Sequence, residues 1–312
     1  MTRGTDSQAS GPPRATDLPL GAAPIVFVGG TGRSGTHVVA RLLGRSEHFA
    51  LIPVECRFHT DADGFPGLLA GEVSKDQFTK RMRGFWWRGF QTNRMRGLHR
   101  VVPRERFDAA LRDFESGFDA DPKAACRELF LGLLAPQAED WPRQGIIEQS
   151  CDVIAQAPAL VELFPEARFV HIVRDGRDAS ASRVAQTRGV VYPRTRKQGI
   201  EWWEARIRAI DAGARAIPDG RLYEIELSRL FGRWRMGALR KLSRHVGVRP
   251  EKSMERFVKS RMSPEKANAE RWRQGISPEL QQELDRLYRE SLERLERDQV
   301  SCAPLVRRAY ER

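Results

Sequence analysis

Short apolar runs along the chain alternate with stretches in which apolar residues recur at helical spacing. Continuous apolar runs of about four to eight residues are typical of strands that are buried on both faces of a sheet. Such runs predict strands at residues 25–28, 48–55, 145–150, 167–173 and 220–227. Because these strands alternate with helices, we expect an α/β fold, with a mostly parallel sheet flanked by helices.

Helical periodicity marks the segments between and after the predicted strands. The segment after residue 35 places four apolar side chains on one side, namely Val38, Val39, Leu42 and Leu43. Further helices are expected within 74–137, with a break near 97–105, and at 153–165, 174–186, 196–217 and 278–298. Since the carboxyl ends of parallel strands meet at one edge of a sheet, we expect the ligand there.

The composition indicates where the domain lies and what it binds. Residues 1–23 are rich in Gly, Pro and Ser and lack the apolar centre of a signal peptide, so we expect a flexible tail and a single domain over 24–312. A net charge of +12 favours anionic partners such as nucleotides, acidic sugars or nucleic acid. No stretch is apolar enough to span a bilayer, and the four isolated cysteines fit a reduced protein, so a cytoplasmic location is expected.

The candidate chemistry begins at a glycine-rich loop, GGTGRSGTH, at residues 29–37. The backbone N–H groups of a loop between a strand and a helix form a phosphate-binding site. An ATP-type P-loop, GxxxxGK[ST], has the same glycine spacing from Gly30 to Gly35. However, Thr36 and His37 replace its lysine and its hydroxyl residue, so a standard kinase or ATPase is not favoured.

The same loop also matches the dinucleotide-binding pattern GxGxxG. Glu55 ends the next strand about 20 residues further on, where a ribose-binding carboxylate belongs. An NAD(P)-dependent oxidoreductase of the Rossmann type is therefore one alternative. A further alternative, based on the net charge alone, is a non-enzymatic protein that binds anions or nucleic acid.

A third interpretation uses Arg33, whose guanidinium can hold a phosphate together with backbone amides and without a metal. Here the chain resembles the sulfotransferases that use 3′-phosphoadenosine 5′-phosphosulfate (PAPS), whose 5′-phosphosulfate loop commonly reads as a glycine followed by (K/R)SGT. The resemblance continues in FVHIVRDGRDASASR, residues 169–183. There Arg174 ends a strand and Ser182 follows eight residues later, as in the family's 3′-phosphate site. A Rossmann oxidoreductase needs no such second site.

Weaker matches at IIEQS, LYEIEL and ERWRQGISPEL extend this resemblance over most of residues 24–295. It implies a P-loop-like sulfotransferase fold, with PAPS as co-substrate and no metal. The acceptor would be a hydroxyl or amine of a glycan, lipid, peptide or small metabolite. The resemblance assigns the nucleotide to Gly32, Arg33, Ser34, Gly35, Thr36 and His37 at the 5′ end, to Arg174 and Ser182 at the 3′-phosphate, and to Arg271 in a closing segment.

Residues around the second strand are candidates for the transfer step, in which Arg33 would stabilise the leaving 5′-phosphate. Glu55-Cys56-Arg57 is similar to the ETR segment of the tyrosylprotein branch, where the glutamate is the general base and the arginine helps at the reaction centre. His59 is the alternative base, because other branches use histidine. In the plainer interpretation, Glu55 and Arg57 form only a surface ion pair.

Two features differ from the family pattern or are not explained by it. Gln149 stands where the family often has lysine, so a cation beside the transferred sulfuryl group is either missing or supplied by another residue. The stretch FWWRGFQTNRMRGLHR, residues 85–100, interleaves aromatic and basic residues. We expect a helix that buries Phe85, Trp86 and Phe90, with an acceptor cleft as the alternative.

Overall fold

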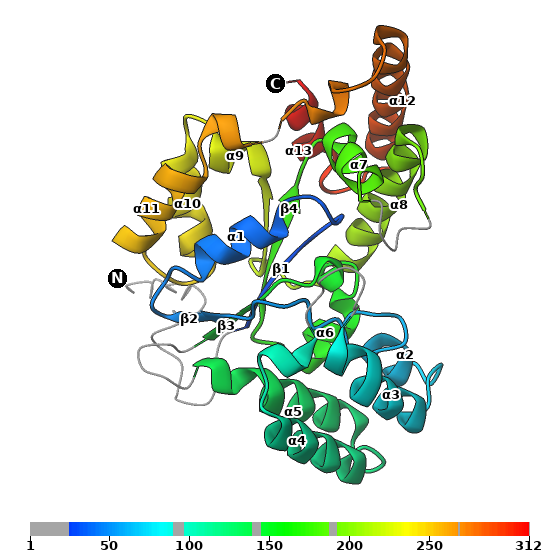
Figure 1. Ribbon diagram of the computed structural model, residues 1–312, viewed down its shortest axis with the longest axis vertical. Helices are drawn as coiled ribbons and strands as arrows, with labels where there is room; N and C mark the ends of the chain where they lie inside the picture. Colours follow the sequence, from blue (N-terminus) through cyan, green and yellow to red (C-terminus); the bar gives the residue numbers. More distant parts are fainter. Residues whose placement is uncertain (1–24, 90–96, 139–144, 187–191, 268, 312) are drawn as a thin grey trace, which may run out of the picture.

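In the computed structural model, five parallel strands form one sheet at the centre of the molecule, as the alternating pattern predicts (Figure 1). The structure describes residues 25–89, 97–138, 145–186, 192–267 and 269–311. The strand order is β2-β3-β1-β4-β5. The strands are β1 (Ile25–Gly30), β2 (Phe49–Leu51), β3 (Gly145–Glu148), β4 (Arg168–Val173) and β5 (Leu222–Glu226).

Helices follow the strands and fill the long segment between β2 and β3. Those before β4 are α1 (Thr36–Leu43), α2 (Phe65–Leu69), α3 (Lys75–Arg81), α4 (Arg104–Gly117), α5 (Pro122–Leu134) and α6 (Ala157–Leu163). Those after β4 are α7 (Gly176–Val184), α8 (Arg196–Ala214), α9 (Leu227–Phe231), α10 (Arg235–His245), α11 (Lys252–Arg261), α12 (Pro278–Arg297) and α13 (Ala303–Tyr310).

The second strand is shorter than the apolar pattern predicts. It was expected over residues 48–55, but β2 contains only Phe49–Leu51. Pro53 follows almost directly and lacks the N–H group that a further ladder hydrogen bond needs. The chain therefore leaves the sheet early, and Glu55 lies in the loop beyond the strand.

Residues of β1 point alternately to the two faces of the sheet, so each face has its own core. Ile25 and Phe27 pack in a cluster with residues of α2 to α6, whereas Val26 and Val28 pack in a cluster with α1 and α9 to α11. Figure 1 shows these two groups of helices on opposite sides of the strands. The sheet is thus covered on both faces, which is why both alternating sets of β1 side chains are apolar and buried.

A third cluster lies beyond the end of β4 and joins α7, α8, α12 and α13. Its centre is formed by Trp203 and Tyr288, both fully buried, with ring centroids 5.1 Å apart. Figure 1 shows α12 and α13 beside α7 and α8 on this side of the molecule. The C-terminal helices are therefore packed against the turn that follows β4.

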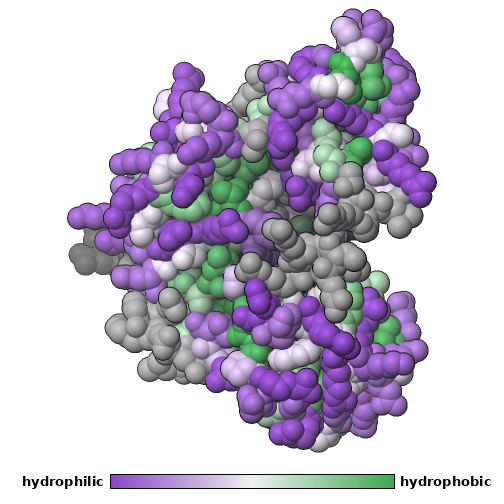
Figure 2. All heavy atoms as spheres, viewed as in Figure 1, coloured by the Kyte–Doolittle hydropathy of each residue, from purple (hydrophilic) through white to green (hydrophobic). Residues whose placement is uncertain are grey.

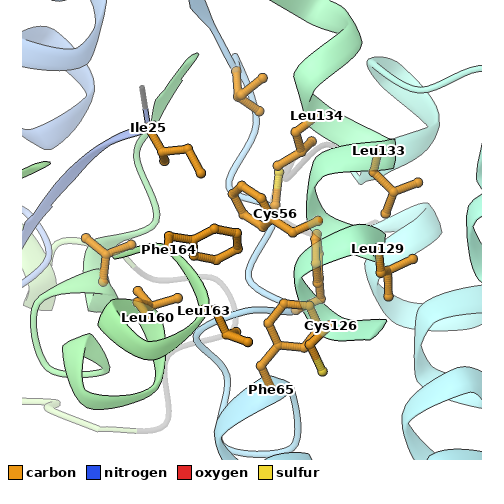
Figure 3. Packing of buried hydrophobic residues seen from close by; sticks show 14 of the residues in the cluster. Ile25, Cys56, Phe65, Cys126, Leu129, Leu133, Leu134, Leu160, Leu163 and Phe164 are labelled. Atoms are coloured by element: carbon orange, nitrogen blue, oxygen red, sulfur yellow. The ribbon is translucent and has the colours of Figure 1, made fainter. Parts of the chain in front are cut away.

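All four cysteines are free thiols and form no disulfide. Cys56 and Cys126 are buried among the apolar side chains of the first cluster (Figure 3). Burial raises the pKa of Cys126 to about 12, because the thiolate would lose its hydration there. Such thiols act as small apolar side chains.

Polar residues cover most of the outer face seen in Figure 2, as a chain with 30% charged residues requires. Among the described residues, no helix combines the length and the apolar character needed to cross a bilayer.

Candidate active site

The loop between β1 and α1 presents a row of backbone donors at the carboxyl edge of the sheet. Gly32, Arg33 and Gly35 have φ angles of 81°, 60° and 95°, which coil the chain tightly. Among the described residues, the N–H groups of residues 32–37 have no backbone acceptor. Together with the N-terminus of α1, these groups form a site that fits the oxygens of a phosphate.

Two glycines of the loop are required by close packing. A Cβ on Gly30 would lie 2.3 Å from Ser34 Oγ and 2.8 Å from the Ile172 carbonyl oxygen. A Cβ on Gly35 would lie 2.8 Å from the Leu227 side chain, in addition to the strain of its positive φ. These contacts hold the loop against the ends of β4 and β5.

The two hydroxyl groups expected to bind phosphate point inward instead. Ser34 is fully buried, and its Oγ has no hydrogen-bond partner among the described residues. Thr36 is 3% exposed, with Oγ1 lying 3.9 Å from Cys151 Sγ. Both hydroxyl groups are thus enclosed by protein, whereas Arg33 of the same loop is exposed.

The structure brings together the predicted 5′ and 3′ phosphate motifs, although 141 residues separate Arg33 from Arg174. Arg33 Nε donates to Ser182 Oγ at 3.0 Å, and an amino group of Arg174 donates to the Arg33 carbonyl oxygen at 2.8 Å. β1 and β4 are neighbours in the sheet, so their following turns end side by side. The loop, Arg174 and Ser182 therefore form one cationic surface.

Electrostatics and shape both indicate an anion site at Arg174. Burial lowers the pKa of this guanidinium, and the nearby charges of Arg33 and Arg271 lower it further, against the effect of Asp178 and Asp175. Three cations that repel one another in this way are stabilised by a bound anion. A cavity of about 970 Å³ opens beside Arg174, lined also by Leu227, Ser228 and Trp272 among other residues. This volume suits a nucleotide-sized ligand.

The remaining charges of the RDGRD stretch hold the site together. Asp175 caps α7 by accepting from the Arg177 N–H at 2.8 Å, and its carboxylate also binds the Arg177 guanidinium at 2.6 Å. Asp178 accepts from the N–H groups of Glu270 and Trp272, both at 3.1 Å. Asp178 thus fixes the short 3₁₀ turn Arg271–Arg273, which is where the predicted Arg271 lies.

Glu55 is paired with His37, not with Arg57. Its Oε1 lies 3.2 Å from His37 Nε2 and accepts from Cys151 Sγ at 3.8 Å. Nδ1 of the same histidine is 2.8 Å from Gln149 Oε1. Residues from the first turn of α1 and from the loops after β2 and β3 therefore meet beside the phosphate loop, and the contacts of His37 with Glu55 and with Gln149 were not expected.

Arg57 has its own partner and a strained backbone. Its φ is 62°, and its guanidinium binds Asp61 through Nε at 2.9 Å and a terminal nitrogen at 2.7 Å. Asp61 also accepts from Trp86 Nε1 at 2.9 Å, so the aspartate is fixed from the other side. The surface pair between Glu55 and Arg57 is therefore not formed.

His59, the alternative base, is enclosed in the core. It is fully buried, packs against Phe27 and Phe130, and pairs through Nε2 with Glu148 Oε2 at 3.1 Å. Although burial acts to raise the pKa of Glu148, the charge of His59 and hydrogen bonds from Ser150 lower it overall. A histidine enclosed in this way cannot reach an acceptor, so its place as the alternative base is not supported.

Sequence reasoning missed Arg183 and Trp202, which lie beside the phosphate loop. The Arg183 guanidinium is 5.5 Å from the ring centroid of Trp202, and a Cβ on Gly32 would lie 3.8 Å from this ring. Burial lowers the pKa of Arg183, as do the nearby charges of Arg33 and Arg57. The position of Arg183 directly after Ser182 was the available signal.

In the aromatic and basic stretch at residues 85–100, the described aromatic side chains pack mainly against the first core cluster. Trp86 is 3% exposed and Phe85 is partly buried, as expected, while Phe90 lies outside the described residues. The helix continues α3 through a π-helical turn, Met82–Trp86, and Arg81 lies 4.5 Å from the Phe85 ring centroid.

One group of described side chains could hold a metal ion, and it is not at the phosphate loop. The ligand atoms of His171, Glu224 and Cys302 lie within 4.8 Å of one another, between β4, β5 and the start of α13. His171 Nδ1 is 2.8 Å from Glu224 Oε1, so the geometry is also that of a buried ion pair.

The strand order argues against the dinucleotide alternative. In a Rossmann sheet the second strand lies beside the first, so an acidic residue at its end reaches the ribose. Here β3 lies between β1 and β2, and Glu55 contacts a histidine of α1 instead.

Comparisons with known proteins agree with this geometry. A sequence model described as Sulfotransferase family matches residues 24–252. The sulfotransferase domain of the Synechococcus PCC 7002 olefin synthase is 17% identical, with a TM-score of 0.52 over 86% of this chain and 94% of that one. A sulfotransferase domain from the curacin biosynthetic pathway is 14% identical, with a TM-score of 0.54 over 86% and 97%. These two structures share the fold.

A search of curated proteins gave no match. The family match covers well over half of the chain, from the start of β1 to the beginning of α11, and includes both phosphate motifs. The alternatives of an NAD(P)-dependent oxidoreductase and of a non-enzymatic anion binder are therefore set aside. The chain belongs to the sulfotransferase family.

Proposed function

We propose that this sulfotransferase uses PAPS as its donor and transfers the sulfuryl group to a hydroxyl or amine. The observation that carries the proposal is the pair of hydrogen bonds that joins the two phosphate motifs, Arg33 to Ser182 and Arg174 to the Arg33 carbonyl oxygen. A nucleotide with phosphates at both its 5′ and 3′ positions needs two anion sites this close together. The cavity beside Arg174 offers the space for its adenosine.

The loop amides and Arg33 would bind the 5′-phosphate, and Arg174 and Ser182 would bind the 3′-phosphate. Arg33 is exposed, and its guanidinium would stabilise the charge that develops on the leaving oxygen. During transfer, the acceptor oxygen or nitrogen forms a bond to sulfur while the bond from sulfur to the 5′-phosphate oxygen breaks. That oxygen keeps the electron pair, and the acceptor proton passes to Glu55, which acts as the base.

Thermal stability in the presence of nucleotides tests the donor. Adenosine 3′,5′-bisphosphate (PAP) should stabilise the protein most within a panel that also contains NADP(H), NAD(H) and ATP with magnesium. At 100 times its Kd, a ligand adds about 2.7 kcal/mol to the free energy of unfolding. Differential scanning fluorimetry measures the shift in Tm. Strong stabilisation by NADP(H) with none by PAP would contradict the proposal.

Substitutions at Arg174 and Ser182 should separate the two phosphates. Arg174→Ala and Ser182→Ala are each expected to weaken PAP binding by about 10-fold to 150-fold, because a hydrogen bond to a charged group is lost (about 1.5–3 kcal/mol). Binding of adenosine 5′-phosphate, which lacks the 3′-phosphate, should hardly change. Isothermal titration calorimetry gives both affinities. Equal losses for the two nucleotides would instead indicate that these residues only shape the loop.

A further inference from the structure

His37 lies in the first turn of α1 and is held by two partners from different loops. Its Nδ1 is 2.8 Å from Gln149 Oε1, directly after β3, and its Nε2 is 3.2 Å from Glu55 Oε1, after β2. The side chain is still 55% exposed, whereas that of Glu55 is 22% exposed. A solvated histidine held at both ring nitrogens is an arrangement that simple packing does not require.

The orientation of Gln149 determines which ring nitrogen carries a proton. Its Nε2 donates to the Ile52 carbonyl oxygen at 3.0 Å, and the side chain is almost fully buried. Because a carbonyl oxygen can only accept, the amide of Gln149 is fixed with Oε1 towards the histidine. His37 Nδ1 must therefore be an N–H donor.

The second ring nitrogen then faces a carboxylate. In a neutral imidazole that is protonated at Nδ1, the lone pair of Nε2 would point at Glu55 Oε1, and the two would repel. A proton on Nε2 turns this contact into a charge-assisted hydrogen bond. The bond to Glu55 raises the pKa of His37 most, and Gln149 raises it further, against the opposing effects of burial and of Arg41 on the same helix.

We propose that His37 is a positioning residue, an imidazolium held between Gln149 and Glu55 that fixes the carboxylate of the base. This rests on the proposed function, in which Glu55 takes the proton from the hydroxyl or amine that receives the sulfuryl group. Both ring nitrogens are engaged, so His37 has none free for an acceptor itself. The contacts of Glu55 with His37 and Cys151 both use Oε1, which leaves Oε2 for that proton.

The same arrangement explains the departure at position 149. A lysine there would place a second donor against His37 Nδ1–H and a second cation beside the imidazolium. The glutamine instead accepts from the histidine, and the positive charge lies on His37, next to the base. The charge is present below the pKa of the imidazolium and is lost as the pH rises through it.

The ring protonation can be measured without any acceptor. NMR titration of the ligand-free protein, with histidine labelled with ¹⁵N, should show His37 titrating above its ordinary value of about 6.5. In Glu55→Gln, which removes the negative partner, His37 should titrate at a lower pH than in the wild type. Titration of the wild-type ring at or below its ordinary value would overturn the proposal, as would an unchanged titration in Glu55→Gln.

The effect on turnover can be measured as PAP release from PAPS, with 4-nitrophenol or water as the acceptor. His37→Leu should lower kcat by about tenfold or more, within the ~10²-fold that a 1 Å misplacement can cost. His37→Gln keeps a donor towards Glu55, so it should retain more activity than His37→Leu. Wild-type turnover should decline as the pH rises through the pKa of His37, and His37→Gln should lack this decline. PAP affinity should stay near the wild-type value in both variants.

His99→Gln is the matched control, because His99 is an exposed histidine outside both predicted phosphate motifs, and its Nδ1 bonds the Trp87 carbonyl oxygen. It should turn over at the wild-type rate. If His37→Leu behaves like this control while Glu55→Gln is impaired, the role of His37 is wrong and the proposed function stands. If Glu55→Gln is fully active, the assignment of the base fails, and the NMR titration still decides whether the ion pair exists.

Discussion

Replacing Glu55 by glutamine is expected to lower turnover by about 10²-fold to 10⁴-fold, which is the usual contribution of a general base. The amide keeps the shape of the side chain and can still contact His37, but it cannot take the acceptor proton. PAP affinity should remain close to the wild-type value, because Glu55 contacts the side chains of His37 and Cys151 and not the side chains of Arg33, Arg174 or Ser182. Single-turnover kinetics together with PAP titration separate these two quantities.

Glu166→Gln is a suitable control for this change. Its carboxylate is 23% exposed, compared with 22% for Glu55, and it is also in an ion pair, 2.9 Å from Arg127. It lies on the segment before β4, away from the loop. Turnover of the control should be unchanged. Equal turnover of Glu55→Gln and of the control would rule out Glu55 as the base.

Arg177→Ala should destabilise the protein by about 3 kcal/mol or more, since removing one partner of a buried ion pair leaves the other uncompensated. Arg177 is 8% exposed, binds Asp175 and Asp285, and lies 4.5 Å, 5.0 Å and 4.7 Å from the ring centroids of Trp272, Tyr288 and Tyr310. Chemical denaturation measures the loss. For a domain of this size, Tm should fall by roughly 6 °C or more.

Arg286→Ala provides the comparison, because its ion pair with Glu290 is exposed and lies on one face of α12. Such pairs contribute about 0.3–0.5 kcal/mol, so its Tm should hardly move. A similarly small effect of Arg177→Ala would mean that the guanidinium is not the link between α7 and the C-terminal helices. The turn after β4 would then be held by the Gly176 N–H bond to the Tyr288 hydroxyl, at 2.9 Å.

The fold could be predicted from the sequence because its strands are buried on both faces. Residues 25–28 form a continuous apolar run and residues 167–173 are rich in apolar residues, and they correspond to β1 and β4. The order of the strands could not be predicted, since it depends on which faces of distant helices fit together. The short β2 shows a second limit, because a run that is apolar up to Val54 leaves the sheet before Pro53.

The meeting of Arg33, Arg174 and Ser182 could be anticipated from a family resemblance and from strand ends at one edge of the sheet. Contacts that depend on loop folding could not. His59 lies in a polar stretch that reads as exposed, yet the loop turns inward and buries the ring against Phe130. The resemblance assigned His37 only to the nucleotide, because Glu55 and Gln149 reach its side chain from loops far away in sequence.

The packing around Arg177 shows which part of this chain folds as one unit. The sequence segment shared with the family ends at residue 252, but the guanidinium at the centre of its second phosphate motif is completed by Asp285 and by rings from α12 and α13. A protein shortened to the shared segment would leave this charge and the Trp203 ring facing water. The cooperative unit is therefore longer than the segment that the family model matches, and the last two helices support the turn that carries Arg174 and Arg177.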